Sequence, residues 1–223
     1  MSVKNLWNTF FDQNPYLNGK APSQFLEKNY ERLTKGKLLD VAMGEGQNAA
    51  FLAGLGFEVT GVDISDLAAE RAKALAYEKD VKIETKSADL DMFLLGVMEY
   101  DTVIMTNYKP STDRFYPEMI KSLKQGGTLL IEFDANLLEK FETTAPTIHF
   151  KLYKENELLR QMKGLRIIHY SEEDHPAGTS VRLIAKKPVD SDAQKYDLFG
   201  MAAKDTEKKS QKQLDLAESL FKK

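Results

Sequence analysis

The sequence contains no cysteine, and this absence removes several classes of chemistry at once. Disulfide bonds, thiolate nucleophiles, iron–sulfur clusters and cysteine-ligated zinc sites all require that side chain. The first twenty residues mix aromatic with polar and charged side chains, unlike a secretory signal, and no run of about eighteen apolar residues occurs. We therefore expect a cytoplasmic protein without a metal site and without a membrane partner.

A strong charge of one sign is also missing. Lysine and arginine total 31 against 34 acidic residues, for a net charge of −3. This balance gives no general electrostatic reason to bind nucleic acid, so we expect a small-molecule partner and leave an oligomer open. The 223 residues are enough for one domain of ordinary size with a substantial core.

The pattern from residue 37 to residue 188 alternates short apolar runs with helical periodicity, which is typical of strands and helices in a parallel sheet. Ser111 is predicted to cap the helix that contains Tyr116 and Leu123. No helix separates the last two strands, so they should pair antiparallel. We predict an α/β, Rossmann-like, doubly wound sheet of seven strands, mostly parallel with a C-terminal antiparallel pair. The expected strands are 38–42, 57–62, 81–85, 102–105, 128–133, 165–170 and 181–186.

The ends of the chain differ from this core. We predict one domain over 1–189, with a helical, aromatic segment at 1–36 before the core at 37–188, and a charged tail at 190–223 that can end in a helix. The aromatic side chains of the first segment have two interpretations: they attach it to the core, or they form a lid over a ligand cleft with Tyr16 and Lys20 near the reacting group. The rings concerned are Trp7, Phe10, Phe11 and Tyr16.

The strongest chemical signal is a glycine turn between the first strand and the first helix. Gly44 and Gly46 allow a ligand to contact the backbone there, and residues 44–49 also satisfy the dinucleotide fingerprint. Asp40, at the end of the strand, would repel a pyrophosphate and suits a cationic ligand. Asp63 ends the second strand, where a carboxylate can accept hydrogen bonds from ribose hydroxyls, whether the ligand is a dinucleotide or a cationic nucleoside.

Several stretches together resemble one family. They are LLDVAMGEGQNAAFLAGLGFEVTGVDIS at 38–65, SADL at 87–90 and LKQGGTLLIE at 123–132. With these motifs the sequence resembles the class I S-adenosylmethionine-dependent methyltransferases, and within them the tellurite-resistance-type small-molecule enzymes. It departs from that subgroup at Gln47, where arginine is usual. The resemblance implies S-adenosylmethionine as the cofactor.

The resemblance also implies which residues bind this cofactor, from the methionine portion through the ribose to the adenine. The methionine portion contacts Asp40, Ala42, Met43, Gly44 and Gly46, the ribose contacts Asp63, the adenine contacts Ile64, Asp89 and Leu90, and Thr106 and Asn107 border both cofactor and substrate.

The methyl acceptor is less determined. A nucleophile that arrives ionised, such as a thiolate, needs no general base, and Tyr16, Tyr108 and His149 are the candidates for contact with the reacting groups. We expect a methyltransferase for a small molecule with a thiol or chalcogen nucleophile. An NAD-dependent oxidoreductase and a non-catalytic cofactor-binding module are the alternatives.

Overall fold

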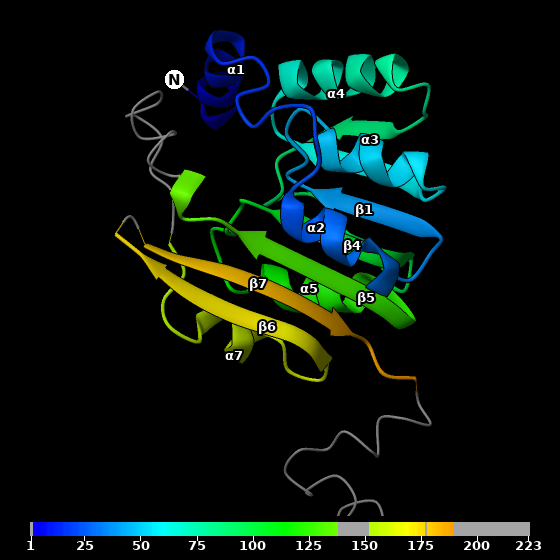
Figure 1. The fold of residues 1–223 in the computed structure, drawn as a ribbon, viewed down its shortest axis with the longest axis vertical. Helices are drawn as coiled ribbons and strands as arrows, with labels where there is room; N and C mark the ends of the chain where they lie inside the picture. Colours follow the sequence, from blue (N-terminus) through cyan, green and yellow to red (C-terminus); the bar gives the residue numbers. More distant parts are fainter. Residues whose placement is uncertain (1, 138–151, 177, 190–223) are drawn as a thin grey trace, which may run out of the picture. The chain divides into compact units, whose positions relative to one another are not determined.

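The structure, a computed structural model, describes residues 2–137, 152–176 and 178–189. The chain divides into two compact units, residues 1–187 and residues 188–223, and everything below concerns the first. Seven strands form one sheet (Figure 1). They are β1 (Lys37–Val41), β2 (Glu58–Asp63), β3 (Glu84–Ser87), β4 (Tyr100–Thr106), β5 (Leu123–Phe133), β6 (Arg166–His175) and β7 (Gly178–Lys186).

The strand order across the sheet is β3-β2-β1-β4-β5-β7-β6. The first five strands pair parallel, whereas β7 lies antiparallel between β5 and β6. This arrangement confirms the predicted seven-stranded sheet with its C-terminal antiparallel pair. The chain reverses its direction of crossover at β1, so the carboxyl ends of β1 and β4 mark the switch point where ligands bind in open α/β sheets.

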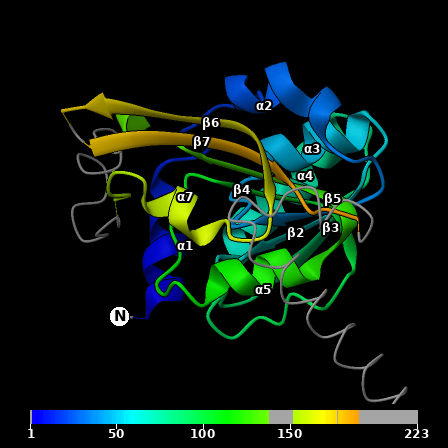
Figure 2. The same cartoon turned by 90° about the horizontal axis from the view of Figure 1, so that it is seen from below.

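Helices cover both faces of the sheet (Figure 2). Apolar side chains of α5 and α7 pack with Leu39 and Val41, and those of α2 and α3 pack with Leu38 on the other face. Successive residues of β1 therefore serve opposite cores, as a pleated strand requires. The helices are α1 (Val3–Gln13), α2 (Gln24–Asn29), the 3-10 turn η1 (Tyr30–Arg32), α3 (Gln47–Gly54), α4 (Asp66–Glu78), α5 (Phe115–Ser122) and α7 (Glu157–Gln161).

Three local predictions need correction. The third strand lies at Glu84–Ser87 rather than 81–85, because Val81 still closes the end of α4 through a hydrogen bond to Ala76 O. Ser111 does not cap α5, which begins at Phe115, and its hydroxyl instead donates to Asp91 Oδ1 at 2.5 Å. Leu123 begins β5 instead of ending the helix.

Two further observations concern the helices and the part of the chain that the structure describes. Among the described residues, no helix has the length and apolar character needed to cross a bilayer. The predicted tail at 190–223 and the candidate His149 lie outside the described residues.

Candidate functional site

Three strands bring polar groups to one edge of the sheet. Val41 of β1 is in register with Val62 of β2 and with Met105 of β4. The residues that follow, Ala42, Asp63 and Thr106, therefore meet at the carboxyl edge. Sequence spacing alone predicted each strand end, and the register makes them neighbours.

The glycine turn is held by the carboxylate of Asp63. Its Oδ2 accepts a hydrogen bond from Gly44 N at 2.9 Å, and its Oδ1 accepts one from Ser65 N at 2.9 Å. Gly46 has φ of 81° directly before α3, a conformation that glycine adopts without steric cost. Burial raises the pKa of Asp63, while the backbone donors Ser65 and Gly44 act against that rise.

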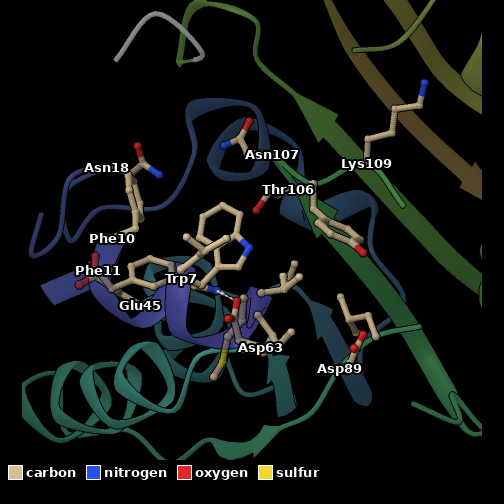
Figure 3. Close-up of a pocket in the computed structure, with 18 of the residues that line it drawn as sticks. Trp7, Phe10, Phe11, Asn18, Glu45, Asp63, Asp89, Thr106, Asn107 and Lys109 are labelled. Atoms are coloured by element: carbon tan, nitrogen blue, oxygen red, sulfur yellow. Dashed lines mark hydrogen bonds between the residues drawn. The ribbon is translucent and has the colours of Figure 1, made fainter. Parts of the chain in front are cut away.

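A cavity of about 440 Å³ opens above this turn. Figure 3 shows α1 residues Trp7 and Phe11 reaching into it from one side, with Asp63 and Asp89 on the other. All residues expected to bind the cofactor line it except Asp40 and Gly46. Those that do are Ala42, Met43, Gly44, Asp63, Ile64, Asp89, Leu90, Thr106 and Asn107.

Asp40 lies beneath the cavity rather than on its wall. The residue is fully buried, and neither carboxyl oxygen has a hydrogen-bond partner among the described residues. Burial raises the pKa of Asp40 well above its ordinary value, and the nearby negative charge of Asp63 raises it further. A buried carboxyl group without a partner is costly when ionised, so the site favours a cation nearby.

The raised pKa of Asp40 makes the stability of the ligand-free protein depend on pH. Because the folded-state pKa exceeds the unfolded one, this group contributes stability below the unfolded value of about 3.8, and the contribution is lost as the pH rises through the folded-state pKa. Asp40→Asn abolishes this titration. We expect the melting temperature of the variant, relative to the parent, to increase as the pH rises above about 3.8, as checked by calorimetry.

The matched control for that measurement is Asp80→Asn, on the exposed turn after α4. Asp80 is exposed and has φ of 54°, which asparagine tolerates well, so this substitution makes the same chemical change without the burial that distinguishes Asp40. A pH-independent difference between Asp40→Asn and the parent would contradict the account of Asp40.

Hydrogen bonds fix the end of β4 at the cavity. Asn48 Nδ2 of α3 donates to Thr106 Oγ1 at 3.0 Å, and Asn48 Oδ1 accepts from Ser23 N at 2.9 Å. Asn107, with φ of 54°, accepts at Oδ1 from Asp134 N at 3.0 Å. These contacts orient both side chains before any ligand arrives.

Tyr108 and Lys109 also line the cavity, and their polar groups differ in the contacts they can make. Burial, with the charges of Asp91, Asp89 and Asp63, raises the pKa of Tyr108 to about 12. Its phenol is therefore protonated at neutral pH and can donate a hydrogen bond but not accept a proton. Lys109 Nζ lies 2.5 Å from Glu157 Oε1 and donates to Leu152 O at 2.7 Å.

Tyr16 and Lys20 lie away from the expected reacting group. Tyr16 does not line the cavity, and its hydroxyl donates to Arg71 O of α4 at 3.1 Å. Lys20 Nζ lies 4.9 Å from the centre of the Tyr16 ring and 2.5 Å from Glu78 Oε2. The pair attaches the segment after α1 to α4, which apolar patterning alone does not reveal.

Sequence reasoning missed one polar contact at the site. Glu45, in the glycine turn, is buried and accepts from Arg71 Nη1 at 3.0 Å. The same Arg71 nitrogen donates to the carbonyl of Phe11 in α1. No sequence signal joins these residues, since Arg71 lies 26 positions after Glu45 and 60 after Phe11. The contact joins α1, the glycine turn and α4.

Comparisons with known proteins agree with this geometry. Residues 38–127 match the family model described as a methyltransferase domain. No curated protein matches the sequence. Solved structures, however, share the fold over most of the chain.

Three of these structures illustrate the likeness. A magnesium protoporphyrin IX methyltransferase from Synechocystis, solved with bound S-adenosylhomocysteine, is 20% identical, covering 83% of this chain and 97% of its own at a TM-score of 0.60. A SAM-dependent methyltransferase from Methanosarcina mazei is 21% identical, and the match covers 70% of this chain and 94% of that one with a TM-score of 0.55. TehB from Haemophilus influenzae is 19% identical, and the match covers 81% of this chain and 67% of TehB with a TM-score of 0.61.

These likenesses are all below 25% identity, so they establish the fold and not the reaction. The family model covers the strands and turns that line the cofactor side of the cavity. Sequence and fold therefore agree on one assignment: residues 38–127 match a methyltransferase domain, and the chain has the Rossmann-like fold of the S-adenosylmethionine-dependent methyltransferases.

Proposed function

We propose that this protein is an S-adenosylmethionine-dependent methyltransferase that acts on a small molecule with a thiol or chalcogen nucleophile. S-adenosylmethionine is the cofactor. The observation that carries the proposal is the pair of buried acids at the glycine turn. Asp63 forms the cavity wall there, and Asp40 lies below it with no hydrogen-bond partner in the described chain.

The residues present fit this cofactor. A bound sulfonium would favour the ionised forms of Asp40 and Asp63, whose pKa values burial raises, and it would give the orphaned carboxyl group of Asp40 a positive charge nearby. Asp63 can accept hydrogen bonds from the ribose hydroxyls, and Asp89 from the adenine amino group. Ile64 and Leu90 offer apolar contact to the base, and the open backbone at Gly44 leaves room for the methionine portion.

When bound, the cofactor supplies a methyl group on a positively charged sulfur. What the chain contributes is alignment and exclusion of water, which are sufficient for much of the acceleration of an in-line displacement. Tyr108 keeps its proton at neutral pH and cannot act as the base. This agrees with a nucleophile that ionises in water before it binds, as a thiol does.

The alternatives fit less well. An NAD-dependent oxidoreductase would bring a pyrophosphate next to the two buried acids, and the family match gives it no support. A non-catalytic module would bind the cofactor without turnover. The tellurite-resistance-type subgroup rests on the motif resemblance, with TehB as one structural neighbour among several.

Calorimetry with the full chain tests the proposal. We expect S-adenosylmethionine and S-adenosylhomocysteine to bind in the micromolar range and NADH not to bind measurably. An assay of released S-adenosylhomocysteine, with thiols, phenols, amines and chalcogen oxyanions as acceptors, then separates an enzyme from a binding module. Tight binding of NADH, or no binding of either adenosyl ligand, would contradict the assignment.

A further inference from the structure

The helix α1 presents an apolar face to the cavity. Val3, Leu6, Trp7 and Phe10 recur at the spacing of one helical face, and all four line the cavity together with Phe11. The Trp7 ring lies 5.5 Å from that of Phe10 and 5.8 Å from that of Phe11, centre to centre. The three rings form a cluster separate from the two main cores. They pack on one another rather than within either of the two main cores.

Polar contacts hold this aromatic wall opposite the cofactor residues. Lys4 forms an ion pair with Asp66 at 2.7 Å, and Ser65 Oγ donates to Asn8 Oδ1 at 2.6 Å. Both partners belong to the start of α4, directly after Asp63. The contact through Arg71 adds a third attachment, at the other end of α1. The ring of Trp7 accordingly faces Asp63 across the cavity (Figure 3).

The charges around the cavity are almost all negative. Among the described lining residues, the acids are Glu45, Asp63, Asp89 and Asp91, and the only base is Lys109. The ammonium of Lys109 is engaged by Glu157 and by Leu152 O, and its side chain points away from Trp7 in Figure 3. Glu45 is paired with Arg71, but an acceptor that carries a carboxylate, phosphate or oxyanion would still lie near Asp63, Asp89 and Asp91, and among the described lining residues only Lys109 has a charge of the opposite sign.

The wall beside the carboxyl ends of β4 and β5 is aromatic as well. Tyr108 and Phe133 line the cavity there, and the phenol of Tyr108 is a hydrogen-bond donor. Aromatic rings from α1 and from the ends of β4 and β5 therefore line one cavity, which favours a flat apolar guest because rings attract one another in stacked and edge-on contacts.

We propose that the methyl acceptor is an aromatic thiol without further charge, and that Trp7 is the residue that selects it by packing against its ring. This inference rests on the proposed function and narrows its substrate class. In the transfer, the thiolate sulfur forms the new bond to the methyl carbon with its own electron pair. The pair from the broken carbon–sulfur bond stays on the sulfur of S-adenosylhomocysteine, and the thiol proton goes to water.

The chain contains a single tryptophan, so its fluorescence reports on Trp7 alone. Two product analogues, thioanisole and 4-(methylthio)benzoate, share the ring and the methylated sulfur and differ in one carboxylate. With saturating S-adenosylhomocysteine, we expect thioanisole to change the emission saturably, with a Kd at least 10-fold below that of the benzoate. Equal or tighter binding of the benzoate, or no saturable binding of thioanisole, would overturn the proposal.

Variants test the role of Trp7 by calorimetry. Trp7→Ala should raise the Kd of thioanisole at least 10-fold, by a larger factor than it raises the Kd of S-adenosylhomocysteine, and Trp7→Phe should restore most of the affinity for thioanisole. Tyr77→Ala is the matched control, because Tyr77 is 89% exposed on α4 and outside the cavity. If Trp7→Ala leaves the Kd of thioanisole unchanged, Trp7 does not select the acceptor.

Failure of this inference can be distinguished from failure of the proposed function. If S-adenosylhomocysteine does not bind to the parent protein, the proposed function itself is wrong. If it binds, thiophenol and 4-mercaptobenzoate are compared as acceptors, with thiophenol expected to give at least a 10-fold higher kcat/KM. Turnover that favours the benzoate or tellurite would overturn the acceptor class alone.

Discussion

Asp63→Asn is expected to weaken binding of S-adenosylhomocysteine by at least about 100-fold. The carboxylate accepts from Gly44 N and Ser65 N and lines the cavity, so it both shapes the turn and faces the ligand. Hydrogen bonds from the two ribose hydroxyls to this charged group would contribute about 1.5–3 kcal/mol each, and loss of both corresponds to a factor of about 100 or more in Kd. An asparagine also turns an N–H group toward one of the two backbone donors.

Calorimetric titration measures this effect, and Asp80→Asn provides the same chemical change on an exposed turn. The control should bind S-adenosylhomocysteine as the parent does. Thermal unfolding of both variants establishes that each is folded at the temperature of the titration. A Kd for Asp63→Asn within about 3-fold of the parent would remove Asp63 from the ligand site.

Gly46→Ala is expected to destabilise the fold by about 3 kcal/mol or more, whereas Gly44→Ala costs only about 1 kcal/mol. Both glycines have positive φ, 81° at Gly46 and 56° at Gly44. A Cβ at Gly46 would lie 2.6 Å from Ala72 Cβ and 2.9 Å from Ala72 Cα, so α4 would have to move. At Gly44 the nearest atom is in the Phe11 ring, at 3.8 Å.

The two variants are compared by thermal and urea unfolding. At about 2–4 °C per kcal/mol for a chain of this size, Gly46→Ala should lower the melting temperature by roughly 10 °C and Gly44→Ala by roughly 3 °C. The double variant Gly46→Ala with Ala72→Gly relieves the Cβ contact. It should be less destabilised than the sum of the two single changes, and strict additivity would argue against the close packing of this turn on α4.

Local signals in the sequence were sufficient to predict the strands and the glycine turn at the centre of the fold. The strand that ends at Val41, the glycine turn at Gly44, and the strand that ends at Asp63 follow from spacing over about 25 residues. Parallel strands end at one edge, so adjacent strand ends predict a common site without any tertiary detail. The antiparallel pair of β6 and β7 was predictable for a different local reason, because no helix separates the two strands along the chain.

The aromatic side of the cavity was decided by tertiary contacts between distant residues. The density of aromatic residues in the first segment singled out the rings of α1, but only the attachment of Asn8, Lys4 and Phe11 to α4 brings them over Asp63. Likewise, the sequence shows Lys109 as a cation, and only the tertiary structure shows that its ammonium group, on the cavity wall, pairs with Glu157, 48 positions later. Periodicity specifies which face of an element is apolar, whereas the partner of a charged group depends on which elements the fold brings together.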